Sequence, residues 1–224
     1  MTHAMPHSTP RVCIVSSSCL ASGPRVEKEA DALAAAGYRV EVLVCHTLDW
    51  MPEWDARIAR QKPWRLSAMD FRPARRHRSP EVLAAAAVHR AARGACLAMR
   101  DVPVALAALA CSPRVLPLAR RAASVSCDLY IAHNLAALPA AALAAAARKR
   151  PFAFDAEDDH FADIPNAQQD DLEGRITHVV MQRLLPRARH VTAASPMMAE
   201  GMAVRYGIPT PTAVHNVFPF SWRE

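Results

Sequence analysis

One stretch, Asp128 to His160, constrains the fold of this chain more than any other. An apolar run at 129–132 is typical of a buried strand, and His133 follows its end. A helix is expected next, with Pro139 in its first turn, where the missing N–H needs no partner. A second apolar run at 152–154 stops in a group of carboxylates. We therefore expect a strand–loop–helix–strand unit with polar groups at the carboxyl ends of parallel strands, where open α/β sheets bind ligands.

The same alternation of apolar runs and helical periodicity covers most of the chain. Further strands are predicted near residues 12, 40, 191 and 213, and an additional one at 66–71. Gly37 should end the first helix, because glycine adopts the left-handed conformation of a helix cap. This order predicts an α/β protein: a three-layer Rossmann-like domain with a mainly parallel sheet.

Serine–proline pairs predict three helix starts. Serine is a favoured N-cap, and proline fits the first helical position. The pairs stand at residues 79–80, 112–113 and 195–196. Between His46 and Arg78 the periodicity fades among tryptophans and arginines, so we expect an irregular insertion there.

The charges are segregated along the chain. The range Arg57–Arg78 holds eight Arg or Lys and one carboxylate, whereas Asp155–Glu173 holds eight carboxylates and no Arg or Lys. The basic range is interpreted either as a solvated arginine-rich surface or as a patch for phosphates or anionic lipid heads. No nucleic-acid motif accompanies it, so no nucleic-acid partner is expected.

The cysteines and the N-terminus bear on the compartment. Six cysteines show no CxxC spacing and mostly stand in apolar contexts, which favours buried free thiols in a reducing cytosol. The N-terminus lacks the basic-then-apolar pattern of a signal peptide. We expect a cytoplasmic protein, with peripheral contact to the inner face of the membrane through Arg57–Arg78 as an alternative.

Four segments, taken in order, resemble the N-terminal domain of family 4-like glycosyltransferases of the GT-B fold. They are SGPRVEKEADALAAAGYRVEVLV from Ser22, DLYIAHN, PFAFDAEDDH, and RARHVTAASPMMAEGMAVRYGIPTPTAVHNVFP. In the third segment Glu157 stands where the family often has histidine.

This resemblance implies the acceptor-side half of an enzyme that transfers a sugar from a nucleotide-sugar donor to a glycan, lipid or small-molecule acceptor. The expected organisation is a mobile tail at 1–10, a Rossmann-like domain at 11–216, and the start of a link to a donor-binding domain at 217–224. The second domain of the family holds the donor, and the chain ends eight residues after Asn216. We expect a nucleotide-sugar substrate, no further cofactor, and a sugar acceptor and a donor-domain polypeptide as partners.

The resemblance also implies site residues. It places His133 in the interdomain cleft, where it would hydrogen-bond the transferred sugar or relay a proton, and it makes Asn134 a substrate-binding or capping residue. The loop with Gly23 and Arg25 is expected to approach a phosphate or to form a plain turn. Because a solitary first domain leaves this edge without its partner, His133, Arg25 and Asp155 should be open to solvent.

The carboxylates after residue 154 allow two interpretations. Asp155 and Glu157 are expected to hydrogen-bond the acceptor, with no metal, as the resemblance to GT-B enzymes implies. The alternative is a metal-dependent enzyme that uses Asp155, Glu157, Asp158 and His160, since hard cations prefer clustered carboxylates. A non-catalytic α/β binding or assembly module that lacks the donor half is the remaining hypothesis.

Overall fold

The computed structural model describes residues 9–73 and 79–218, and these form one seven-stranded sheet. The strands are β1 (Arg11–Ser16), β2 (Arg39–His46), β3 (Arg65–Asp70), β4 (Leu129–His133), β5 (Phe152–Ala156), β6 (Val191–Ala193) and β7 (Thr212–Ala213). All neighbouring strands pair in parallel, in the order β3-β2-β1-β4-β5-β6-β7. The direction of the strand order changes between β1 and β4, which is where doubly wound sheets bind ligands. The predicted parallel α/β sheet is confirmed.

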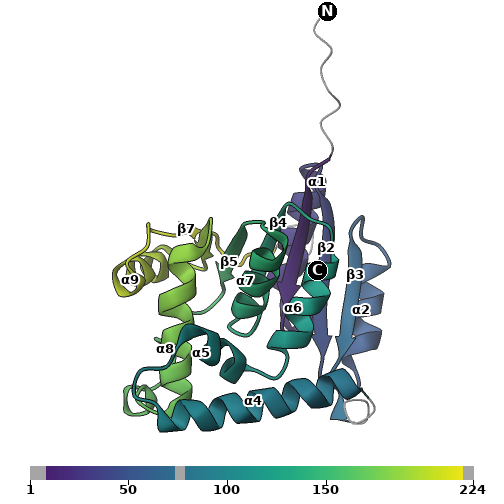
Figure 1. The fold of residues 1–224 in the computed structure, drawn as a ribbon. Coiled ribbons are helices and arrows are strands. Elements are labelled where there is room, and N and C mark those ends of the chain that lie inside the picture. Colours follow the sequence, from purple (N-terminus) through teal and green to yellow (C-terminus); the bar gives the residue numbers. More distant parts are fainter. Residues whose placement is uncertain (1–8, 74–78, 219–224) are drawn as a thin grey trace, which may run out of the picture.

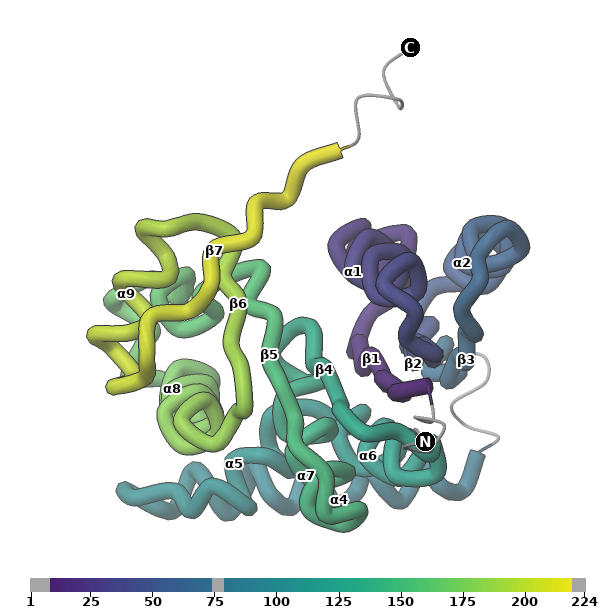
Figure 2. Tube along the Cα trace, turned by 90° about the horizontal axis from the view of Figure 1, so that it is seen from above, coloured from purple at the N-terminus to yellow at the C-terminus, as the bar shows by residue number. Residues whose placement is uncertain are grey.

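Helices cover both faces of the sheet, so the molecule has three layers (Figures 1 and 2). The α-helices are α1 (Pro24–Ala35), α2 (Met51–Ala59), α4 (Pro80–Ala98), α5 (Val104–Cys111), α6 (Val115–Ser124), α7 (Ala137–Arg148), α8 (Leu172–Leu184) and α9 (Pro196–Tyr206). Three short 3-10 helices are η1 (Leu20–Ser22), η2 (Asn166–Gln168) and η3 (Leu185–Arg187). Figure 2 shows α1 and α2 on one side of the sheet and α4 to α7 on the other.

The side chains of β1 point alternately into two hydrophobic cores, one on each face of the sheet. Val12 and Ile14 pack in the core on the α1 side, whereas Cys13 and Val15 belong to the larger core on the other side. In that larger core α7 buries residues on nearly every side, most of them alanine. Small side chains let helix and sheet approach closely, which explains how a chain with few aromatic residues fills its interior.

Two of the three serine–proline predictions are confirmed in place. Ser79 caps α4 and Ser195 caps α9, each accepting a hydrogen bond from the backbone N–H three residues on. The third is displaced: Ser112 accepts from the N–H of Arg114, and α6 begins only at Val115. Pro113 therefore lies in the turn before the helix.

The expected irregular insertion contains regular structure. Residues 51–59 form α2, and β3 occupies the place where the additional strand was predicted. The buried Asp55 explains how α2 is held, because its carboxylate accepts from the N–H groups of Leu20 and Ala21 and from His46. Leu20 and Ala21 are distant from Asp55 in sequence, and the aromatic and basic residues on the surface of α2 obscured its periodicity.

Several predictions fall partly outside the described residues. These are the tail at 1–10, of which 1–8 are not described, the end of the basic range at 74–78, and the end of the link at 219–224. All six cysteines are free, and all but Cys111 are buried, as predicted. Among the described residues, no helix combines the length and apolar character needed to cross a bilayer.

Candidate functional site

Four polar residues stand in one row at the carboxyl edge of the sheet. Ser16 on β1 pairs in register with His133 on β4, His133 with Asp155 on β5, and Asp155 with Thr192 on β6. Residues in register on neighbouring strands point to the same face, so their side chains meet. The predicted proximity of His133 and Asp155 is confirmed.

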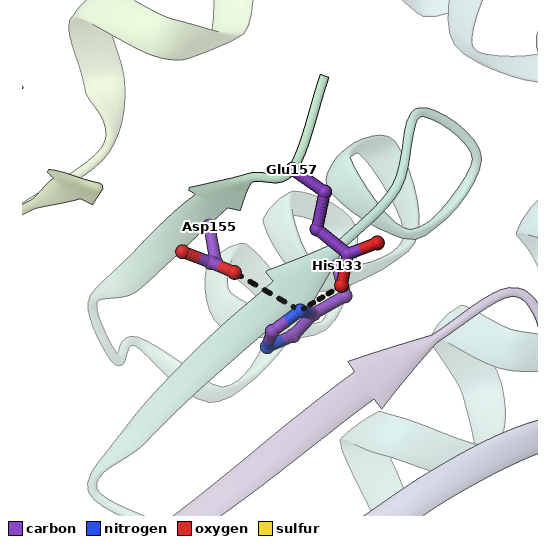
Figure 3. Close-up of side chains that lie close together, drawn as sticks. All are labelled: His133, Asp155 and Glu157. Carbon is purple, nitrogen blue, oxygen red and sulfur yellow. Dashed lines mark ion pairs between the residues drawn. The ribbon is translucent and has the colours of Figure 1, made fainter. Parts of the chain in front are cut away.

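Three carboxylates surround the His133 ring. Its Nε2 lies 2.5 Å from Oε2 of Glu29 on α1, and its Nδ1 lies 3.3 Å from Oδ2 of Asp155 and 3.6 Å from Oε1 of Glu157. Figure 3 shows Asp155 and Glu157 converging on Nδ1. The spacing to Nδ1 is that of an ion pair rather than of a close hydrogen bond, and neither Nδ1 nor Oε1 of Glu157 has a hydrogen-bond partner among the described residues.

This arrangement favours a charged imidazolium. Burial by itself lowers the pKa of His133, but Glu157, Glu29 and the charge of Asp155 together raise it to about 9. His133 is therefore protonated at neutral pH and presents N–H donors on both ring nitrogens.

Arg25 on α1 compensates the charge of Asp155. Its Nε donates to Oδ2 and its Nη2 to Oδ1, the latter at 2.7 Å, so the pair is bidentate. Burial raises the pKa of Asp155, but the hydrogen bond from Arg25 and the charge of His133 outweigh it, so the pKa falls below its usual range. Thr192 also donates to this carboxylate.

The expectation that this edge is open to solvent is wrong. His133 is 0% exposed, Asp155 3% and Arg25 6%. Helix α1 covers the row, and the chain after β7 lies against α1: Nη1 of Arg25 donates to the carbonyl of Val214, and Nζ of Lys28 donates to Asn216 and to the carbonyl of Val217.

The end of this C-terminal segment does expose apolar side chains. Val217 is 68% exposed and Phe218 is 58% exposed, although the Phe218 ring also lies under Lys28. Phe220 and Trp222 lie outside the described residues.

Asn134 and Gly23 have local roles in the loops of this edge. Asn134 has a φ of 66°, and its Oδ1 accepts from the N–H and the hydroxyl of Ser17, which joins the loops after β1 and β4. Its carbonyl accepts from the first N–H groups of α7. Gly23 precedes α1 with a negative φ, so its backbone does not require glycine. Their binding roles stay predictions.

The structure gathers His133, Asp155 and Glu157 so that one ligand atom of each lies within 4.8 Å of the others, close enough to hold a metal ion. The chemistry of the set fits a cation poorly. Asp155 already accepts from Arg25 and Thr192, and a protonated His133 has no lone pair to offer.

The remaining residues of the alternative metal set lie apart from this group. Asp158 is exposed, and the Nε2 of His160 is buried without a hydrogen-bond partner among the described residues. The neighbouring Asp159 instead accepts from the hydroxyl of Tyr206 at 2.7 Å and pairs with Arg205 at 3.4 Å, which ties the acidic loop to α9.

Sequence reasoning missed Glu29 and Thr192. Thr192 follows from the same argument as Asp155, since it is a polar residue near the carboxyl end of a strand. Glu29 leaves no such signal: it lies 104 residues from His133, in the middle of a helix and not at the end of a strand. Only the crossing of α1 over the sheet brings the two together.

Comparison with known proteins identifies the family and agrees with the fold. The family model described as "Glycosyl transferase 4-like domain" matches residues 21–216. The chain belongs to this family, and its fold is the Rossmann-like α/β half of a GT-B glycosyltransferase. No curated protein sequence matches the chain.

Solved structures share the fold at low identity. HepE of Anabaena in complex with UDP and glucose is 13% identical with a TM-score of 0.53, and the match covers 94% of this chain and 45% of HepE. UGT2 of Phytolacca americana, complexed with UDP-2fluoro-glucose and pterostilbene, is 15% identical with a TM-score of 0.51, covering 96% and 55%. The lipopolysaccharide outer core galactosyltransferase WaaB is 12% identical with a TM-score of 0.50, covering 93% and 46%. The chain spans about half the length of these proteins.

Proposed function

We propose that residues 11–216 form the acceptor-side half of a glycosyltransferase, and that His133 acts at the reacting centre. The observation that carries this proposal is the buried row at the carboxyl edge, with His133 surrounded by Glu29, Asp155 and Glu157 in a glycosyl transferase 4-like domain. The complexes of two structural neighbours, one with UDP and glucose and one with UDP-2fluoro-glucose, support the same substrate class.

His133 works as a charged hydrogen-bond donor in this proposal. With a pKa of about 9 it is protonated at neutral pH, so it donates to a sugar hydroxyl rather than removing a proton from one. Because its ring is fully covered, substrate must displace the Glu29 carboxylate from Nε2. Asp155, locked by Arg25, keeps the ring oriented, and Glu157 accepts from a hydroxyl of the acceptor.

The donor is held by a second domain across the carboxyl edge. We retain 11–216 as the acceptor-side domain and 217–224 as the start of the link, in a cytoplasmic protein. Asn216 and Val217, held by Lys28, mark where this link leaves the described fold. By themselves, residues 1–224 should bind a nucleotide-sugar weakly and show no transfer.

Reconstitution tests the proposal. The chain is mixed with a donor-domain polypeptide, nucleotide-sugar and a panel of acceptors, and release of nucleoside diphosphate is measured. His133→Ala should lower the rate about a hundredfold, the typical effect of removing one charged donor. His190→Ala is the matched control, because His190 is exposed and immediately precedes β6, at the opposite edge of the sheet from the His133 row. Transfer by the unaided chain, or equal rates for the two variants, would contradict the proposal.

A non-catalytic binding or assembly module is the alternative that the exposed Val217 and Phe218 favour. Such a module would bind the donor-domain polypeptide with equal affinity in the wild type and in His133→Ala, without any release of nucleoside diphosphate. The metal-dependent alternative is tested by calorimetry with Mn²⁺ and Mg²⁺. Specific binding that is lost in Glu157→Gln would support it.

A further inference from the structure

A second polar surface lies at the opposite, amino edge of the sheet. Arg11, Arg39 and Arg65 are the first residues of the neighbouring strands β1, β2 and β3, and Arg121 lies in the last turn of α6. Together with Tyr38 and Glu41 they line a groove of about 550 Å³, called here the arginine groove. A cavity of this size is in the range of small-molecule sites.

Strand register directs these side chains to one face. Arg11 pairs with Arg39, and Arg65 pairs with Glu41, two residues after Arg39 on the same strand. Residues two apart on a strand share a face, so the three arginines and Glu41 project on the α6 side, beyond the end of that helix. The convergence results from the register of three strands rather than from a run of sequence.

The charges of the groove are not balanced within the described fold. Glu41 accepts from Ser67 and lies 3.6 Å from Arg121, so its charge is already shared with one arginine. The guanidinium groups of Arg11, Arg39 and Arg65 have no carboxylate partner among the described residues, and all three are exposed. The nearby Asp128 accepts from the backbone N–H of Arg11 and pairs with Arg150.

The pairing of Arg11 with Arg39 is unfavourable by itself. Like charges directly opposite each other on neighbouring strands destabilise a sheet. An anion held between them removes that repulsion. Guanidinium groups suit phosphate in particular, because they donate two parallel hydrogen bonds to its oxygens.

We propose that the arginine groove binds a soluble or lipid-borne anion that carries two or more phosphate groups. Three uncompensated guanidinium groups exceed the needs of a single phosphate. The site is separate from the His133 row, because Ser16, the residue in register with His133, is five residues along β1 from Arg11, about 16 Å at the rise of a strand. The proposal therefore stands independently of the proposed function.

Calorimetry with inorganic tripolyphosphate tests the site. The wild type should bind, and Arg39→Gln should weaken binding about tenfold, the scale of one charge-assisted hydrogen bond. Arg90→Gln, on the exposed face of α4, removes the same charge outside the groove and should bind like the wild type. Equal losses of affinity in the two variants would mean that tripolyphosphate is attracted by net charge alone, and this result would overturn the proposal. Absence of tripolyphosphate binding by the wild type, together with absence of vesicle binding in the experiment below, would also overturn it.

Vesicles distinguish the source of the phosphate. The same three proteins are sedimented with vesicles of phosphatidylcholine, alone or mixed with cardiolipin, whose headgroup carries two phosphates. Sedimentation that requires cardiolipin and is lost in Arg39→Gln assigns the groove to lipid headgroups, whereas tripolyphosphate binding without sedimentation assigns it to a soluble anion. Failure to bind either probe would contradict the proposal.

Discussion

The charged side chains at the two edges of the sheet differ in burial and in pairing. At the carboxyl edge His133, Arg25 and Asp155 are buried, and each has a partner of opposite charge. At the amino edge Arg11, Arg39 and Arg65 are exposed and lack carboxylate partners among the described residues. The same parallel register aligns both groups.

The difference follows from what covers each edge. Helix α1 and the chain after β7 lie over the carboxyl edge, and a charge taken out of water must be paired there. At the amino edge the groove remains open, so water screens the arginines and pairing is not required. Substitutions at the carboxyl edge should therefore change stability, and those at the amino edge should chiefly change binding.

The largest expected effect comes from Arg25→Met. It leaves the Asp155 carboxylate buried without its bidentate partner, and we expect a loss of about 3–5 kcal/mol in the free energy of unfolding. Urea denaturation measures the loss. Arg90→Met should change stability by less than about 0.5 kcal/mol, and Asp155→Leu added to Arg25→Met should restore part of the loss. A loss below about 1 kcal/mol would show that Asp155 is not paired as described.

The next effect is a pH dependence. The pKa of His133 is raised from 6.5 to about 9. Its protonation therefore stabilises the fold fully below about pH 6.5, and this stabilisation is lost as pH rises through about 9. The difference between the two pKa values corresponds to about 3 kcal/mol in the free energy of unfolding. Urea denaturation across this range should show the wild type losing stability relative to His133→Gln. Parallel pH curves for the two proteins would contradict the assignment.

A smaller effect is expected from Glu29→Gln. This change removes one of three carboxylates around His133, and the Glu29 side chain is 27% exposed, so solvent moderates the loss. We expect about 1 kcal/mol of destabilisation at neutral pH. Glu200→Gln, exposed on α9, is the control and should have no measurable effect. If the two variants were equally stable, the contact with Nε2 would not contribute.

The smallest effect on stability belongs to Arg39→Gln. Removing one of two opposed guanidinium groups should leave the free energy of unfolding unchanged or raise it by up to about 0.5 kcal/mol. The gain should shrink as salt is added, because the repulsion is screened. A clear destabilisation would mean that Arg39 is paired within the fold, and the contrast between the edges would fail.

Much of the fold was predictable because its signals are local. Strand runs, the helix caps at Ser79 and Ser195, and the positive φ of Gly37 each depend on a few neighbouring residues. His133 and Asp155 followed from the same signals, since parallel strands bring their carboxyl ends to one edge. Helix α2 was missed because its aromatic and basic surface residues obscure its periodicity, and because its buried Asp55 is held by backbone N–H groups more distant in sequence, at Leu20 and Ala21.

The surroundings of the site depend on contacts that no local pattern records. The loop with Arg25 was expected to approach a phosphate or to form a plain turn, and neither interpretation included the pairing of Arg25 with Asp155, 130 residues away. The arginine groove is a further case, because its members begin separate strands and converge only through register. Such contacts depend on how a helix crosses the sheet and on which strands become neighbours.

The most direct test of this account is the protonation of His133, on which the charge pairing at the carboxyl edge is centred. NMR titration of the imidazole C–H resonances, assigned with His133→Gln, measures its pKa in the folded chain. We expect a pKa near 9, lowered in Glu29→Gln and unchanged in Arg39→Gln. A pKa near the ordinary 6.5 would contradict it, because His133 would then be neutral among its three carboxylates.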